Sequence, residues 1–146
     1  MKKSRISYYD VAPEGLKEMF DMEKYVYKNL EKSLVELVKI RVSQLNGCAF
    51  CINMHTQEAR KAGESEQRIY LLNAWTETDL YTARERAALQ LAEAVTHIST
   101  HTISDDFYES VRSHFTEREF VDLLLAINQI NSWNRISITM ANPLPK

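Results

Sequence analysis

The chain has 146 residues, of which 45% are hydrophobic and 26% are charged, a balance typical of a folded globular protein. A net charge of −2 at pH 7 gives no basic surface of the kind that nucleic-acid-binding proteins carry, so we expect no nucleic-acid partner. No apolar run is long enough to predict a signal peptide or a membrane span, so we expect a cytoplasmic protein with no membrane partner and a single domain over residues 1–146.

Helical periodicity dominates the chain, and no segment shows the alternation of a β-strand. Proline falls only near the two ends, at Pro13, Pro143 and Pro145, and the long stretch without proline is typical of a helix-rich chain. The spacing of apolar residues predicts a first helix over 13–29 and a second helix over 33–45.

Capping and stop signals mark the later helices. A third helix carries both cysteines; it begins after Gly47 and ends near Gly63, since glycine commonly follows the last turn of a helix. Four further helices are predicted to begin after the capping residues Ser65, Thr82, Ser104 and Thr116. The last helix is apolar on more than one face over residues 123–127, which indicates burial in the core or against another subunit. We therefore predict an all-α fold, a compact bundle of about six to seven helices with the cysteines at the N-terminus of the third.

The most informative motif is a pair of cysteines three residues apart, Cys48 and Cys51, followed by His55. Residues at i, i+3 and i+7 share one helical face, so both sulfurs and the imidazole point the same way. These are the only cysteines of the chain, and in a reducing compartment such a pair is more often catalytic or metal-binding than structural. Cys48 lies close to a helix start, where free amides and the macrodipole favour a thiolate. The motif therefore favours a redox site.

Glu36 is the predicted partner of His55. If the helices over 33–45 and 48–61 form an antiparallel hairpin, Glu36 lies roughly 15 Å from the turn and His55 roughly 12 Å, at about 1.5 Å per residue. The two side chains are then level with each other, and Cys51 and His55 form an i, i+4 pair. This geometry predicts a chain Glu36–His55–Cys51 along which a proton can pass.

Other interpretations of these residues stay open. The two thiols could form half of a zinc site, but no second CxxC follows, and Cys48, Cys51 and His55 supply only three ligands from one helix. We therefore expect no metal and no other cofactor. A lone carboxylate such as Glu36 is most often a surface residue of an amphipathic helix, and a lone histidine is most often a structural one.

The pattern Glu36…Cys48-x-x-Cys51-x-x-x-His55 resembles the signature of the alkylhydroperoxidase D-like (AhpD-like) proteins of the carboxymuconolactone decarboxylase superfamily. Further stretches resemble members of this group, so that the likeness covers nearly the whole chain: residues 8–13, 37–48 and 133–135. The resemblance implies an all-helical fold that assembles into homo-oligomers such as dimers, trimers or hexamers.

The resemblance also implies an enzyme that reduces hydroperoxides with its thiols. By this analogy Cys51 is the peroxidatic thiol, and Cys48 resolves its sulfenic acid into a Cys48–Cys51 disulfide. His55 and Glu36 relay the proton, and an external dithiol of the thioredoxin or lipoyl type restores the thiols. One position departs from well-studied members, which carry a histidine immediately before the second cysteine; Phe50 stands there in this chain.

Three rival functions use the same features. A disulfide oxidoreductase would exchange with protein or lipoyl thiols but consume little peroxide. A lactone decarboxylase-type lyase of the same superfamily would not need the cysteines. A redox sensor or interaction module would bind its partner in only one oxidation state. We predict the thiol-dependent peroxidase, with the oxidoreductase or the redox-sensing module as the alternative.

Overall fold

A computed structural model of the chain describes residues 4–145. Within that range it is all-helical, with no strand. The elements in chain order are α1 (Tyr8–Val11), α2 (Pro13–Asn29), α3 (Lys32–Asn46), α4 (Ala49–Lys61), α5 (Glu66–Leu71), the 3-10 helix η1 (Leu72–Glu77), α6 (Ala83–Thr96), α7 (Asp105–Arg112) and α8 (Glu117–Thr139). The predicted fold class is confirmed. The single-turn helix α1, which has no side-chain cap, is the helix that the sequence pattern missed, so the third predicted helix is α4.

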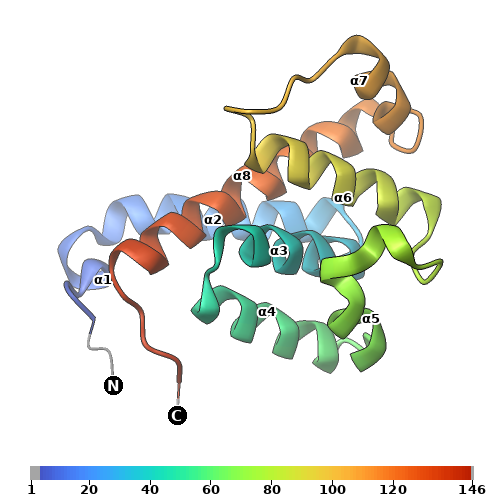
Figure 1. Cartoon of the computed structure of the whole chain (residues 1–146). Helices are drawn as coiled ribbons and strands as arrows, with labels where there is room; N and C mark the ends of the chain where they lie inside the picture. The colour runs from blue at the N-terminus through green and yellow to red at the C-terminus, as the bar shows by residue number, and fades with distance from the viewer. Residues whose placement is uncertain (1–3, 146) are drawn as a thin grey trace.

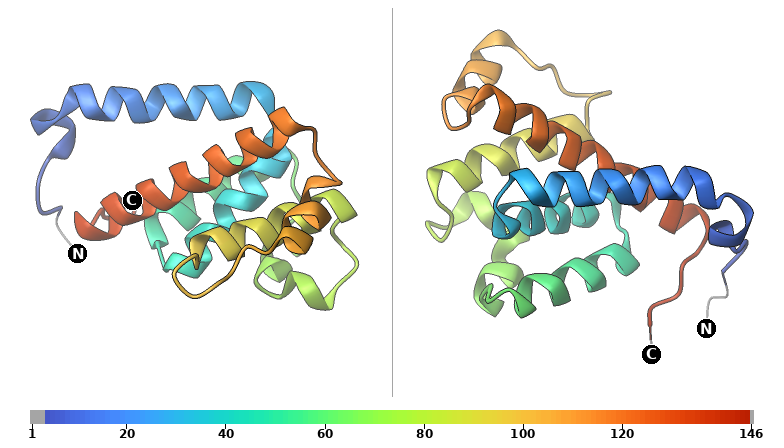
Figure 2. Two further views of the ribbon diagram at one scale, coloured as in Figure 1. Left: turned by 90° about the horizontal axis from the view of Figure 1, so that it is seen from above. Right: turned by 180° about the vertical axis from the view of Figure 1, so that it is seen from behind.

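Helix α3 lies at the centre of the molecule. It packs against α4, α6 and α8, and Figure 1 shows α4 running beside it on one side while α8 crosses on another. Figure 2 shows α2 extended along α8, which closes a further side. Ten consecutive residues of α3, from Leu34 to Ser43, are buried. A helix buried on all sides has to accommodate its polar side chains inside the protein.

The core divides around α3. Val35, Val38 and Val42 belong to a larger apolar cluster that also contains both cysteines and draws on α2, α6 and α8. Leu37 and Ile40 belong to a smaller cluster with η1 and α6. Because side chains on opposite faces of α3 enter different clusters, this helix is fixed in both rotation and position.

The turn between α3 and α4 is only two residues long. Gly47 adopts a left-handed conformation (φ 68°), its N–H donates to the carbonyl of Gln44, and the N–H of Cys48 donates to the carbonyl of Ser43. This is the hydrogen-bond pattern of a Schellman motif, for which glycine is the usual residue. The motif ends α3 and sends α4 back antiparallel to it.

The predicted caps are also confirmed. Ser65 and Ser104 accept hydrogen bonds from the backbone three residues later, and Thr82 and Thr116 form complete capping boxes. The helix predicted after Ser65 is interrupted, because α5 passes into the kinked η1 near Ala74. None of the helices of residues 4–145 combines the length and apolar character needed to cross a bilayer.

Replacing Gly47 with alanine is expected to lower the free energy of unfolding by about 1 kcal/mol, the cost of a left-handed backbone for a residue with a Cβ. No atom lies within 4 Å of the position that the Cβ would take, so the cost is conformational and not steric. Urea denaturation of the disulfide-bonded protein measures it. Gly15→Ala is the matched control, because Gly15 lies in α2 with open space around it and alanine there should leave stability equal or higher. Equal stability of both variants would contradict the prediction.

Candidate active site

The two cysteines open helix α4. Cys48 is the N-cap residue, and Cys51 lies in the first turn. They form a disulfide, with their Cα atoms 5.3 Å apart, and both are almost fully buried, at 1% and 2% exposure. The N–H of Cys51 donates to Sγ of Cys48 over 3.3 Å, so the sulfur occupies the place of an N-cap oxygen. The start of α4 therefore favours negative charge on the Cys48 sulfur when the disulfide is open.

His55 and Glu36 form a buried pair across the α3–α4 hairpin. Nδ1 of His55 lies 2.9 Å from Oε2 of Glu36, and the two residues are 3% and 1% exposed. A carboxylate at Nδ1 holds the ring proton there, which leaves Nε2 to accept a proton from another group. His55 also follows Cys51 by one turn of the same helix. The structure thus brings the four predicted residues together on one hairpin; their catalytic roles remain predictions.

Tyr27 is a member of this site that the sequence analysis did not identify. Its hydroxyl donates to Oε1 of Glu36 over 2.5 Å, so both oxygens of that carboxylate have a partner. Burial, and then the hydrogen bond to Glu36, raise the pKa of Tyr27 above its usual range. In the sequence Tyr27 is simply one apolar position of the first predicted helix. Nothing in its spacing indicates that its hydroxyl reaches α3.

A second ion pair, between a buried lysine and a partly exposed glutamate, lies beside Tyr27. The side chain of Lys39 is fully buried, and its ammonium group contacts Oε1 of Glu23 and lies 4.4 Å from the centre of the Tyr27 ring. Desolvation lowers the pKa of Lys39, and the attraction of Glu23 opposes that shift. Gln129 of α8 donates to the other oxygen of Glu23. An unpaired ammonium group at the buried Lys39 would be unfavourable, so these residues hold α2, α3 and α8 together.

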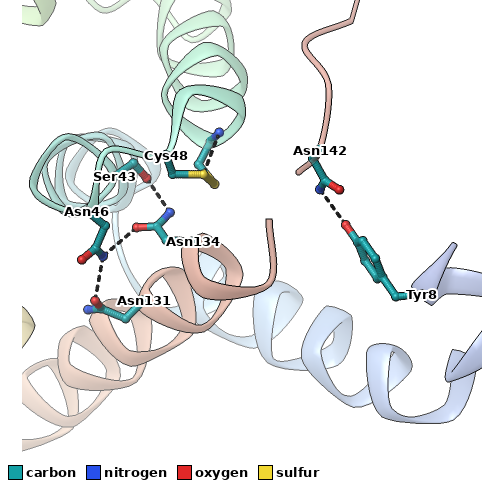
Figure 3. Close-up of a disulfide and its surroundings, with 8 residues drawn as sticks. Tyr8, Ser43, Asn46, Cys48, Asn131, Asn134 and Asn142 are labelled. Carbon is teal, nitrogen blue, oxygen red and sulfur yellow. Dashed lines mark hydrogen bonds between the residues drawn. A yellow bond between two sulfur atoms is a disulfide. The ribbon is translucent and has the colours of Figure 1, made fainter. Parts of the chain in front are cut away.

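A network of amide side chains fixes the turn that carries Cys48. Asn134 of α8 accepts a hydrogen bond from Asn46 and donates one to Ser43, over 2.9 and 3.0 Å. Asn46 also donates to Asn131 over 2.9 Å, and Figure 3 shows this network at the end of α3 next to the disulfide. Every link joins the last turn of α3 to α8. The network therefore fixes the place from which the cysteine pair begins.

Two hollows border the disulfide. Cys51 and His55 line a cavity of about 240 Å³ whose walls include several aromatic side chains. The aromatic side chains are Tyr8, Tyr9, Phe20, Phe50 and Trp133. Cys48 instead lines a wider groove of about 680 Å³ beside the segment that follows α8. Asn142 lies between the two and donates to the hydroxyl of Tyr8 over 2.7 Å (Figure 3).

The side chains of the site are those that thiol chemistry requires. Among residues 4–145, no group of three or more His, Cys, Asp or Glu side chains is arranged to hold a metal ion. What the site does contain is a sulfur pair, a buried imidazole and a carboxylate bound to it. Such an arrangement can form and break a disulfide and move a proton beside it.

Replacing Tyr27 with phenylalanine is expected to lower the free energy of unfolding by about 1–3 kcal/mol near neutral pH, because Glu36 loses a buried donor. The raised pKa means that folded Tyr27 keeps its proton where the unfolded phenol, with a pKa of 10.0, loses it. The stabilisation is thus complete below pH 10 and is lost as the pH rises above it. Urea denaturation of both proteins at about pH 8 and about pH 11 tests this. A stability difference that does not shrink at the higher pH would contradict it.

Comparisons with known proteins agree on the family. A model of the Carboxymuconolactone decarboxylase family matches residues 13–94, a range that includes the whole Glu36–His55 motif. The chain is 58% identical to the uncharacterized protein YdfG of Bacillus subtilis (strain 168) over 139 residues, which are 94% of this chain and 95% of the relative.

Two solved structures are similar over most of the chain. ATU0492 of Agrobacterium tumefaciens, a protein of unknown function that carries the description antioxidant defence protein AhpD, has a TM-score of 0.93 and 42% identity over 99% of both chains. An uncharacterized peroxidase-related protein of Silicibacter sp. TM1040 has a TM-score of 0.80 and 26% identity over 91% of this chain and 71% of its own. The chain therefore belongs to the carboxymuconolactone decarboxylase family, as an AhpD-like member of that superfamily.

Proposed function

We propose that the protein is a thiol-dependent peroxidase that reduces hydroperoxides at Cys48 and Cys51. One observation carries the proposal: the second cysteine of a disulfide-forming pair lies one helical turn from an imidazole that a buried carboxylate orients. A peroxidatic thiol needs a base beside it and a second thiol within bonding reach, and this hairpin supplies both. The descriptions of the AhpD-like and peroxidase-related structures support the same class of activity.

In the proposed reaction the Cys51 thiolate attacks the terminal oxygen of the hydroperoxide. The O–O bond breaks, Cys51 becomes a sulfenic acid, and the departing alkoxide takes a proton from His55. Glu36 stabilises the imidazole in its charged form and holds its orientation. The thiol of Cys48 then attacks the sulfenic sulfur, water leaves, and the disulfide forms. An external dithiol restores the two thiols by exchange.

Two effects influence which cysteine attacks the peroxide, and they favour different residues. The helix N-terminus favours a thiolate at Cys48, an effect of about 1 kcal/mol or less. His55 favours Cys51, because a directed base contributes about 10²–10⁴-fold to a proton-transfer step. Cys51 and His55 also line the same cavity, which Cys48 does not. The directed base is the larger effect, and we assign the attack to Cys51.

The alternative is a disulfide oxidoreductase, or a redox-sensing module, without significant peroxidase activity. Phe50 favours it, because this apolar ring stands where well-studied relatives carry a histidine between the cysteines. The open groove at Cys48 also favours this alternative, because a thiol can approach Cys48 there. Such a protein would react fast with dithiols and consume negligible peroxide.

Cys51→Ser is expected to abolish peroxide consumption, because it removes the attacking sulfur. Cys48→Ser is expected to consume a single equivalent and stop as a sulfenic acid that dimedone traps and excess peroxide overoxidises. Stopped-flow peroxide reduction by the prereduced proteins, with and without a dithiol, measures both. Full turnover by Cys51→Ser would refute the assignment. Fast dithiol exchange without peroxide consumption by the unchanged protein would establish the oxidoreductase instead.

Glu36→Gln is expected to slow sulfenic acid formation by about 10²-fold or more, because the relay loses its carboxylate while both thiols stay in place. The control is Glu93→Gln. Glu93 is also a carboxylate paired with a residue of α3, but its partner is Arg41 and it borders neither hollow at the disulfide. Single-turnover kinetics should give the control the rate of the unchanged protein. Equal rates for both variants would remove Glu36 from the mechanism.

A further inference from the structure

We propose that the hydroperoxide and the reductant reach the disulfide through different openings, and that the reductant attacks at Cys48. The inference rests on the proposed function, because it takes the Cys48–Cys51 disulfide as the species that has to be reduced. It adds a binding site, the groove beside Cys48, the sulfur that the reductant attacks, and one property of the reductant, a negative charge.

The disulfide lies between the two hollows. Cys51 and His55 line the aromatic cavity but not the groove, and Cys48 lines the groove but not the cavity. Three residues line both hollows and separate them: Phe50, Ser137 and Asn142. Each sulfur therefore has its own approach from outside.

The geometry of thiol–disulfide exchange makes this separation matter. The incoming thiolate approaches the sulfur that it attacks from the side opposite the sulfur that leaves, and it forms a mixed disulfide. Attack on Cys51 would have to pass through the aromatic cavity of about 240 Å³, which is below the roughly 300–1,000 Å³ of most ligand pockets. Attack on Cys48 comes from the groove of about 680 Å³. Gly47 and Ala49, which flank Cys48 there, are small and exposed.

Two opposing effects on the leaving sulfur influence which cysteine the reductant attacks. The N–H of Cys51 bonds to the Cys48 sulfur, which makes Cys48 the better leaving group and favours attack on Cys51 by less than about tenfold. His55 acts the other way, since it can protonate Cys51 as that sulfur leaves, an effect of about 10²–10⁴-fold. Protonation of the leaving sulfur is the larger effect and agrees with the steric argument.

The residues of the groove indicate what binds in it. Arg5 is the only charged side chain among the described residues that line it, and Ile138 and Leu144 present half-exposed aliphatic surface. One guanidinium nitrogen of Arg5 donates to the carbonyl of Thr139, which holds this charge at the end of α8. A carboxylate on a short aliphatic dithiol matches this arrangement, and a cationic thiol does not.

One thiolate of the dithiol attacks Sγ of Cys48, the bond to Cys51 breaks, and Cys51 takes its electron pair and a proton from His55. The second thiol of the dithiol then attacks the other sulfur of the same dithiol, which is bound to Cys48. Cys48 leaves as a thiolate beside the N–H of Cys51, and the dithiol leaves as a cyclic disulfide. The proton of the second dithiol thiol restores His55, so two electrons and one proton pass to the cysteine pair and Cys48 remains a thiolate.

The attacked sulfur can be identified directly. The full chain is oxidised with diamide, mixed with the monothiol 3-mercaptopropionate, quenched in acid and mapped by mass spectrometry. We expect the adduct on Cys48. An adduct on Cys51, or none on either cysteine, would overturn the inference. Because no peroxide is used, a protein that gives the Cys48 adduct but does not reduce hydroperoxides would refute the proposed function and leave this inference standing.

A variant that fills the groove gives an independent test. Ala49→Trp places a bulky ring at the first residue of α4, and it should slow reduction by dihydrolipoate about tenfold or more relative to oxidation by hydroperoxide in the same protein. The matched control is Ala83→Trp at the exposed first residue of α6, outside both hollows, which should leave the ratio of the two rates unchanged. The same ratio in both variants would overturn the inference.

Discussion

The structure depends on the burial of charged side chains along a single central helix. Helix α3 is enclosed on all sides, yet it carries Glu36, Lys39 and Arg41 among its buried residues. An unpaired charge in that position would cost several kcal/mol, so each one has to find a partner on a neighbouring helix. Glu36 binds His55 of α4, and Arg41 binds Glu93 of α6. The requirement for pairing thus fixes α3 against its neighbours and creates the site.

The cysteine pair obtains its environment from the same arrangement. A two-residue turn returns the chain along α3, and amide contacts from α8 hold the end of that turn. The first sulfur therefore meets an amide of a helix start, while the second lies one helical turn before His55 and lines the same cavity. Two chemically equivalent thiols become different in this way. In the proposed function, one is suited to leave or to accept exchange, and the other to attack a peroxide.

Much of this was predictable because the signals are local. Caps such as Thr82 and Thr116 act within four residues of themselves, and a glycine stop needs only its own backbone, so the helix boundaries follow from the sequence. Glu36 and His55 lie at the same height along the hairpin, because the rise per residue is constant in two helices joined by a short turn. The helix after Ser65 breaks in η1, where the Trp75 indole bonds to Glu93, a contact that no local pattern contains.

The sequence could not predict the contacts of Tyr27 or the pairing of Lys39 with Glu23 either. These contacts join different helices, and only the packed core determines how those helices are rotated relative to one another. They also connect the two ends of the site. Glu23 lines the aromatic cavity, Lys39 bridges it to the Tyr27 ring, and the Tyr27 hydroxyl holds the carboxylate behind His55. A molecule that moves the Glu23 side chain in this cavity would therefore also disturb the contacts that hold Glu36. By thermodynamic reciprocity, the state of those contacts then affects how tightly the cavity binds such a molecule.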